Sequence, residues 1–330
     1  MLESSETCTA QVSETNSGAA LAAAKCLRLW ARIERALKRR RDRRNAVSTL
    51  ELQEQLESRG QLPSMTVAIS LENVSFAYRT QPVVQNVSLE IPQHSLLALI
   101  GPNGSGKTTL LRLMSKVLQP QHGQISLDGQ PLQRFAARDL ARKLAVISSE
   151  QHFEFPFSVE NVVSMGRFPH RNRLERMRSH DWNVVEDAMD KTDVLQFRHR
   201  PISQLSSGEK QRVLVARAIA QQPSILMLDE PNAHLDINHQ IAVFKLLRLL
   251  NRQHRMTIIV VLHDLSAAAA LCETIVLLHR GRIVRIGTPA EVITPELIRQ
   301  TYGAEVVVFP SPVGGCPQVA FGTMHEPAGP

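Results

Sequence analysis

The sequence is poor in cysteine and in aromatic residues: its 330 residues include four cysteines, two tryptophans and two tyrosines. Cys8, Cys26, Cys272 and Cys316 are too scattered for the close pairs that bind zinc and too few for a disulfide framework. No stretch approaches the roughly 18 uninterrupted apolar residues of a membrane-spanning helix. We therefore expect a globular protein of a reducing compartment, not a secreted scaffold or a membrane protein.

A general excess of basic charge is also missing, although the net charge is +7. Residues 25–44 alone contain ten Lys/Arg and two acidic residues, a local charge of +8, which leaves −1 for the rest of the chain. The body of the protein therefore lacks the electrostatic footprint of a polyanion-binding protein, and we expect no nucleic-acid partner.

Residues 1–64 differ in composition from the rest of the chain, and two interpretations stay open for this extension. Its first 18 residues are polar and predict disorder. Four apolar residues then recur at roughly helical spacing among arginines: Leu27, Trp30, Ile33 and Leu37. The segment is either a basic amphipathic helix that binds an anionic lipid surface or a dispensable extension before Met65.

Residues 65–303 have the pattern of an α/β domain. Short runs of Val, Ile and Leu alternate with helical stretches, which predicts a mainly parallel, buried sheet with helices packed on it. The clearest strands are expected at 96–100, 224–229, 257–262 and 274–279, and helices are expected to start at Lys107, Gly208 and Asp236. Residues of about 157–205 predict a small helical insertion, and residues 304–330 predict one short strand and a loose tail.

The segment LLALIGPNGSGKTT contains a phosphate-binding loop in its required context, after an apolar strand and before a helix. Its glycines allow backbone N–H groups to turn toward phosphates, and the helix N-terminus adds its positive dipole end. Lys107 is expected to reach the β and γ phosphates of ATP, and Thr108 to offer its hydroxyl to Mg²⁺. The candidate phosphate loop comprises Gly101, Pro102, Asn103, Gly104, Ser105, Gly106, Lys107, Thr108 and Thr109.

The segment SILMLDEP supplies two carboxylates at the end of a buried strand. Open α/β sheets bind ligands at this edge, so Asp229 is predicted to hold Mg²⁺ beside Thr108. Adjacent residues at a strand end point in different directions, which leaves Glu230 to polarise the attacking water as the general base. Such pairs also cap helices, so the prediction depends on the phosphate loop.

A second anion-binding element is predicted at LSSGE, where Ser206, Ser207, Gly208 and Glu209 start a long helix. A helix N-terminus with free N–H groups and a hydroxyl favours phosphate. The segment lacks the paired lysine and hydroxyl of a phosphate loop and a strand-end carboxylate for Mg²⁺, so it cannot hydrolyse ATP alone. The LSSGE segment is therefore predicted to supply only one half of a nucleotide-binding site.

These motifs, in this order and together with a lone His after a later strand, resemble the nucleotide-binding subunit of ABC transporters over residues 67 to about 303. The resemblance implies a P-loop ATPase fold of ABC type, with an N-terminal antiparallel β part beside the parallel core. It also implies a head-to-tail dimer in which Ser206, Ser207 and Gly208 contact ATP bound to a second copy of this chain. Ser207 stands where the family usually has Gly.

Three further positions follow from the same resemblance. Tyr78 matches the aromatic residue that stacks on adenine, although a Tyr at a strand end more often packs against neighbours. His263 in VVLHD matches the histidine that hydrogen-bonds the γ phosphate. Asp236 matches an aspartate at the dimer interface, and it is equally suited to cap the next helix.

One segment departs from the family pattern. The family has a glutamine at the end of the strand after the phosphate-loop helix, where it contacts Mg²⁺ and couples to the membrane subunit. Here Ser149 aligns with that position, and Gln151 lies two residues later. We favour Gln151 as the third metal ligand.

The segment FPFSVENVVSMGRFPHR is similar to ATPases that import iron-siderophores, haem or vitamin B12. Among these three cargoes we prefer an iron chelate, haem included. The resemblance implies membrane permease partners, indirectly a solute-binding protein, and a peripheral position on the cytoplasmic face of the inner membrane. A different class stays open, the ABC-type ATPases of DNA repair or translation. Their long coiled coils or duplicated ATPase domains are not found in this sequence.

Overall fold

The computed structural model describes residues 66–148, 155–172, 175–232 and 235–321. The chain divides into two compact units, Met1–Ser64 and Met65–Pro330, and the described residues all belong to the second. Among them no helix is both long and apolar enough to cross a bilayer.

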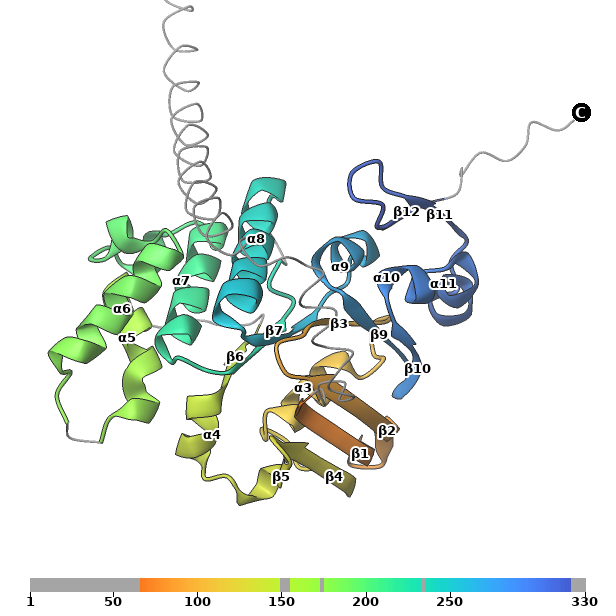
Figure 1. Cartoon of the computed structure of the whole chain (residues 1–330), viewed down its shortest axis with the longest axis horizontal. Coiled ribbons are helices and arrows are strands. Elements are labelled where there is room, and N and C mark those ends of the chain that lie inside the picture. The colour runs from red at the N-terminus through yellow and green to blue at the C-terminus, as the bar shows by residue number, and fades with distance from the viewer. Residues whose placement is uncertain (1–65, 149–154, 173–174, 233–234, 322–330) are drawn as a thin grey trace, which may run out of the picture. The chain divides into compact units, whose positions relative to one another are not determined.

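A six-stranded sheet lies at the centre of this unit, in the strand order β10-β9-β3-β8-β7-β6 (Figure 1). Neighbouring strands from β9 to β6 run parallel, and β10 joins the edge antiparallel. The strands are β3 (Leu96–Ile100), β6 (Leu144–Ile147), β7 (Ile225–Asp229), β8 (Thr257–Val261), β9 (Thr274–His279) and β10 (Arg282–Gly287). Every residue of β3, β7 and β8 is buried, so the prediction of a mainly parallel, buried sheet is confirmed.

Side chains alternate between the two faces of this sheet, and each face has its own hydrophobic core. On β3, Ala98 and Ile100 belong to one core, whereas Leu97 and Leu99 belong to the other. The helices that contribute to the first core include α7 (Ser207–Ala220), α8 (Ile237–His254) and α9 (Leu265–Leu271). The second contains residues of α3 (Lys107–Met114). Three of these helices were predicted from the sequence to start at Lys107, Gly208 and Asp236. In the structure they begin at Lys107, Ser207 and Ile237.

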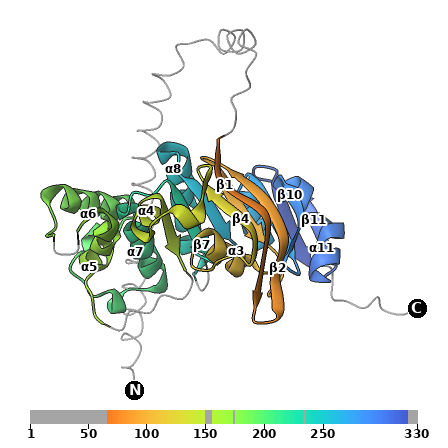
Figure 2. The ribbon, with the colours of Figure 1, turned by 90° about the horizontal axis from the view of Figure 1, so that it is seen from below.

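The second core is closed by an antiparallel sheet in the order β2-β1-β4-β5, which lies beside α3 in Figure 2. Its strands are β1 (Val67–Tyr78), β2 (Gln81–Pro92), β4 (His122–Leu127) and β5 (Gln130–Pro131). A two-residue turn joins β1 to β2, and Arg79 adopts φ +55° there. This sheet is the antiparallel part that the family resemblance implies, and it brings Tyr78 to the end of a strand.

A group of helices projects from the sheet between β6 and β7 (Figures 1 and 2). They are α5 (Val159–Ser164), η2 (Met165–His170), α6 (Ser179–Lys191), η3 (Leu195–Phe197), η4 (Ile202–Gln204) and the start of α7. Arg167 is buried among them: its Nε donates to Asp181 Oδ1 at 3.0 Å and its Nη1 donates to Ala220 O at 2.9 Å. One guanidinium thereby joins η2, α6 and α7.

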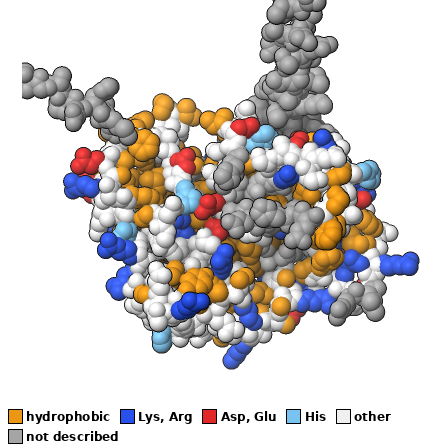
Figure 3. Space-filling view, turned by 180° about the vertical axis from the view of Figure 1, so that it is seen from behind, with side chains coloured by type: hydrophobic (Ala, Val, Ile, Leu, Met, Phe, Trp, Pro, Cys, Tyr) orange, Lys and Arg blue, Asp and Glu red, His pale blue; other side chains and the backbone are white. Residues whose placement is uncertain are grey.

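The remaining elements lie around the sheet edges: η1 (Leu132–Arg134), α4 (Ala137–Lys143), α10 (Pro289–Val292) and α11 (Pro295–Tyr302). The C-terminal end differs from the expectation of one short strand, because β11 (Val306–Pro310) pairs with β12 (Pro317–Phe321) as a hairpin. The Pro/Gly-rich residues 311–316 form its turn. Val307, Phe309 and Phe321 are exposed on it, and hydrophobic side chains gather on that side of the molecule in Figure 3.

Candidate nucleotide-binding site

The phosphate loop connects the carboxyl end of β3 to the start of α3. Gly106 adopts φ +101°, and a Cβ there would lie 2.7 Å from Val83 O. A Cβ on Gly101 would lie 2.1 Å from Leu278 O. Both positions therefore exclude a side chain, which lets the loop backbone pack between β2 and β9. Asn103 and Gly104 at the tip are exposed, where they are accessible to a ligand.

Lys107 points back along this loop. Its Nζ donates to Gly101 O at 2.8 Å and to Pro102 O at 3.0 Å, and the side chain is buried. Burial lowers the pKa of the Lys107 ammonium, and the carboxylates of Glu230 and Asp229 oppose this shift. Ser105 Oγ is also buried, without a hydrogen-bond partner among the described residues. The loop thus holds a buried cation and a buried polar atom beside an exposed tip, an arrangement suited to phosphate oxygens.

Thr108 and Asp229 meet at the neighbouring strand ends. The Thr108 hydroxyl donates to Asp229 Oδ1 at 3.2 Å, although the two residues are 121 positions apart. Burial raises the pKa of Asp229, and the charge of Glu230 adds to this, whereas the Thr108 hydrogen bond opposes it.

This pair fits Mg²⁺, because a hydroxyl and a carboxylate are hard oxygen donors and Mg²⁺ is usually held by one or two carboxylates plus substrate phosphates. Among the described residues there is no cluster of three or more His, Cys, Asp or Glu that would suit another metal. Both candidates for the third ligand, Gln151 and Ser149, lie outside the described residues.

Glu230 follows Asp229 but points elsewhere, because its backbone is left-handed with φ +51°. Its N–H donates to Val261 O at 3.1 Å on the adjacent strand β8. The register pairs Asp229 with Val261, so the chain beyond β8 brings His263 to the same edge of the sheet. His263 Nε2 donates to Glu230 Oε1 at 2.5 Å. The two side chains form a partly exposed acid–base pair beside Asp229 and Lys107.

Tyr78 lies at the end of β1, 42% exposed, and packs edge-on against Phe76 with ring centroids 4.9 Å apart. Tyr78 pairs with Gln81 at the start of β2, two residues before the Val83 carbonyl that approaches Gly106. An exposed ring on a strand that runs past the phosphate loop is suited to stack on a base.

Ser206 is the N-cap of α7 and forms a reciprocal pair with Glu209. Its Oγ accepts from Glu209 N at 3.3 Å, and Glu209 Oε2 accepts from Ser206 N at 2.8 Å. Burial acts to raise the pKa of Glu209, but these hydrogen bonds and nearby Arg212 outweigh it and lower the pKa. Ser206, Ser207 and Gly208 therefore form an ordered helix N-terminus with a hydroxyl beside its N–H groups.

Asp236 is the N-cap of α8, the structural role that the sequence predicted as an alternative. Its Oδ1 accepts from His239 N at 2.9 Å and from His239 Nδ1 at 2.7 Å, which lowers the pKa of Asp236. His239 also lies against Gly208, so it connects the two segments. The sequence prediction missed His239, and only its spacing of three residues from Asp236 could have indicated it.

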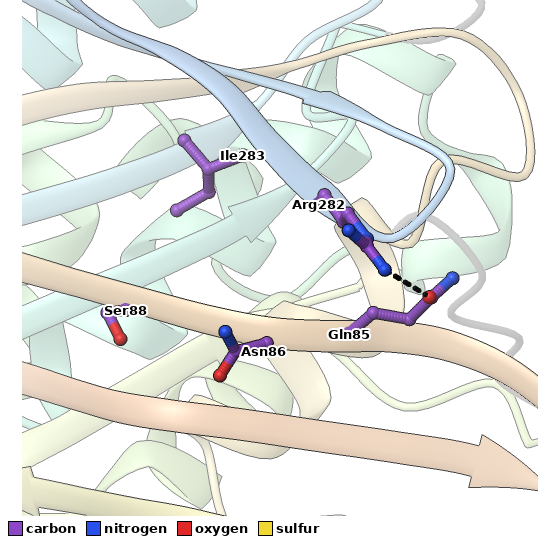
Figure 4. Close-up of a pocket in the computed structure, with 5 residues that line it drawn as sticks. All are labelled: Gln85, Asn86, Ser88, Arg282 and Ile283. Carbon is purple, nitrogen blue, oxygen red and sulfur yellow. Dashed lines mark hydrogen bonds between the residues drawn. The ribbon is translucent and has the colours of Figure 1, made fainter.

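A separate polar pocket of about 360 Å³ lies between β2 and β10, lined by Gln85, Asn86, Ser88, Arg282 and Ile283 (Figure 4). Arg282 Nη2 donates to Gln85 Oε1 at 3.3 Å across it. None of these lining residues is a predicted nucleotide ligand.

Sequence comparisons agree with this geometry. Residues 84–233 match the family model described as ABC transporter. The ferric enterobactin transport ATP-binding protein FepC of Escherichia coli K12 is 37% identical over 75% of this chain and 92% of that protein. The hemin import ATP-binding protein HmuV of E. coli O157:H7 is 36% identical over 77% and 99%. The iron(3+)-hydroxamate import ATP-binding protein FhuC of Bacillus subtilis is 34% identical over 74% and 91%.

Solved structures show the same fold. CbiO1 of Clostridium perfringens, part of the ABC transporter complex CbiONQ, aligns with a TM-score of 0.63 at 25% identity, over 71% of this chain and 94% of that one. A dimeric bacterial ABC transporter cassette aligns with a TM-score of 0.59 at 26% identity, over 67% and 98%.

Proposed function

Since this chain belongs to the ABC transporter family of ATP-binding subunits, we propose that it hydrolyses ATP to power a membrane importer of iron chelates, siderophore or haem. The observation that carries the proposal is the convergence of three elements at the carboxyl ends of β3, β7 and β8: Lys107 in its loop, the Thr108–Asp229 pair and the Glu230–His263 pair. Each element alone also occurs in sites of different chemistry, but together they supply a phosphate-binding lysine, oxygen ligands for Mg²⁺ and a base for the attacking water, the groups that one copy contributes to phosphoryl transfer.

ATP is bound by the phosphate loop, with adenine on Tyr78. The loop N–H groups and Lys107 hold the β and γ phosphates, and Lys107 exchanges its neutral carbonyl partners for anionic oxygens. Thr108 and Asp229 would hold Mg²⁺, which would neutralise charge that develops on the phosphate oxygens. The positioned charges lower the barrier because they are oriented before the reaction begins.

Glu230 accepts the proton of the attacking water, whose oxygen bonds to the γ phosphorus while the bond to the β–γ bridging oxygen breaks. His263 holds the Glu230 carboxylate in position, and it can also donate to a γ-phosphate oxygen. Phosphate and ADP leave, and the proton passes from Glu230 to solvent. General base catalysis of this kind contributes about 10²- to 10⁴-fold to the rate.

The site is completed by a second copy of the chain. Ser206, Ser207 and Gly208 form an ordered helix start with an N-cap hydroxyl, but they lack the lysine and hydroxyl pair of the phosphate loop and the carboxylates at a strand end. We assign them to the nucleotide held by the partner copy, together with the Asp236 segment. A dimer arranged head to tail then encloses two ATP molecules, and hydrolysis opens it.

The proposed cargo is supported by the relatives, which are named for ferric enterobactin, iron hydroxamate and hemin transport. The chain would therefore act beside integral membrane permease subunits, on the cytoplasmic face of the inner membrane, and receive solute indirectly through a binding protein. Vitamin B12 is a less favoured cargo. ATPases of DNA repair or translation are not favoured, because these relatives are transport proteins.

Growth of a strain that lacks this chain tests the proposal. Iron supplied only as the imported chelate, whether a ferric siderophore or haem, should not support growth, whereas an inorganic iron salt should. Complementation with the parent chain restores growth, and Glu230→Gln does not. Normal growth on every chelate, with impaired DNA repair or translation instead, would contradict the importer function.

A further inference from the structure

His239 occupies an unusual position between two segments of the proposed dimer interface. It lies in the first turn of α8, and both its backbone N–H and its Nδ1 donate to Asp236 Oδ1, at 2.9 and 2.7 Å. The neighbouring Gln240 braces the same segment, because its Nε2 donates to Leu235 O at 3.0 Å. The first turn of α8 thus holds residues 235–236 in place through two side chains.

The opposite edge of the His239 ring faces α7. A Cβ built on Gly208 would lie 2.1 Å from His239 Cδ2 and 2.8 Å from Nε2. Gly208 is buried and lies in the first turn of a helix, where alanine is the better helix former. Its backbone does not require glycine. The imidazole therefore occupies the space that a side chain at this position would need.

We propose that His239 is a positioning residue that fixes the distance between Gly208 of the LSSGE segment and Asp236. Its Nδ1 edge holds the aspartate and its Cδ2–Nε2 edge packs on the glycine, so a shift of one segment moves the other. This inference rests on the proposed function, in which both segments face the second copy of the chain. Through His239, contact of Asp236 with the partner sets the LSSGE segment on the partner's nucleotide.

A double-mutant cycle separates this role from a structural one. The variants are His239→Ala, His239→Asn, Gly208→Ala and the double variant Gly208→Ala/His239→Ala, each in the full chain. An asparagine amide can keep the hydrogen bond to Asp236 but lacks the edge that faces Gly208. Steady-state turnover at saturating Mg-ATP, affinity of the monomer for a fluorescent ATP analogue, and melting temperature are measured for each.

We expect His239→Ala to lower turnover by about tenfold, as for loss of a hydrogen bond to a charged group. Affinity of the monomer for ATP should change less than about twofold, because Tyr78 and the phosphate loop are untouched. His239→Asn should recover part of the turnover. Gly208→Ala should be slower than the double variant, since removal of the ring makes room for the added methyl group.

Turnover of His239→Ala within twofold of the parent would overturn the inference, as would a double variant no faster than Gly208→Ala. A loss of melting temperature with unchanged turnover of the folded fraction would assign His239 a structural role only and would also overturn it. Glu230→Gln is assayed in parallel. If that variant hydrolyses ATP normally or forms no ATP-dependent dimer, the proposed function fails irrespective of His239.

Discussion

His263 Nε2 lies 2.5 Å from Glu230 Oε1, although the two residues are on different loops and 33 positions apart. The contact results from sheet register, since Asp229 at the end of β7 pairs with Val261 at the end of β8. The register thereby places His263, which would hold the γ phosphate, against Glu230, which would activate water.

Glu230→Gln is expected to lower ATP turnover by about 10²- to 10⁴-fold, because an amide cannot accept the proton. Binding of ATP should persist, so the variant should accumulate as an ATP-bound dimer. Phosphate release and light scattering with size-exclusion chromatography measure the two effects. Glu296→Gln, in the first turn of α11, is the matched control with parent-like turnover. Near-normal hydrolysis by Glu230→Gln would remove this residue from its assigned role.

Ser206→Ala and Thr288→Ala form a second matched pair. Each removes the side chain of a reciprocal N-cap, with Glu209 on α7 and Glu291 on α10. Each should lower the free energy of unfolding by about 1 kcal/mol. Only Ser206→Ala should also impair hydrolysis and formation of the Glu230→Gln dimer, because Ser206 is the residue that we propose contacts the partner's nucleotide. Equal turnover of the two variants would contradict the half-site arrangement.

Asp229→Asn is expected to stabilise the fold while it weakens Mg-ATP binding. Burial raises the pKa of Asp229 above 3.8, so the folded chain holds this proton more tightly than the unfolded chain does. The free energy of unfolding then falls as the pH rises from 3.8 through the folded pKa, and at neutral pH the carboxylate is destabilising.

In thermal unfolding at neutral pH without nucleotide, Asp229→Asn should melt higher than the parent, by about 2–4 °C for each kcal/mol. Added Mg-ATP should then stabilise the parent more than the variant. A lower melting temperature without nucleotide would contradict the prediction.

Asp181→Asn should change the stability in the opposite direction from Asp229→Asn and destabilise the fold. Burial acts to raise the pKa of Asp181, but hydrogen bonds from the Arg178 backbone and from Arg167 outweigh it, and the pKa is lowered. Asp181 therefore stabilises the fold above pH 3.8, and this contribution is lost as the pH falls through the lowered pKa. At neutral pH the variant leaves Arg167 buried without its carboxylate, which costs about 3–5 kcal/mol.

Urea unfolding at neutral pH and in acid measures this effect. The difference between Asp181→Asn and the parent should shrink as the pH falls below 3.8. A difference that is independent of pH would assign the loss to packing and not to the ion pair.

Local chemistry made much of the candidate site predictable. The phosphate loop, the Asp-Glu pair and the LSSGE segment each combine a buried strand or a helix start with a few residues of fixed spacing, so their positions follow from the sequence. The meeting of Thr108 and Asp229 follows too, because carboxyl ends of parallel strands share one edge of the sheet.

Other contacts depend on packing between distant segments, which no local pattern encodes. His239 meets Asp236 within one helical turn, but its contact with Gly208 depends on how α8 packs beside α7. The pairing of β12 with β11 required a turn within residues 311–316, whose Pro and Gly predicted only a loose tail. Arg167 resembles a surface charge in the sequence, and only the fold encloses it between Asp181 and Ala220.

The left-handed backbone of Glu230 has an evolutionary consequence. Side chains other than glycine adopt this conformation at an energetic cost, so a glycine at position 230 would relax the chain. Asp229 beside it is likewise expected to destabilise the fold relative to its amide, because burial raises its pKa. A fold optimised for stability alone would therefore have other residues at both positions, so the two carboxylates are a stability cost of the chemistry proposed for this edge of the sheet.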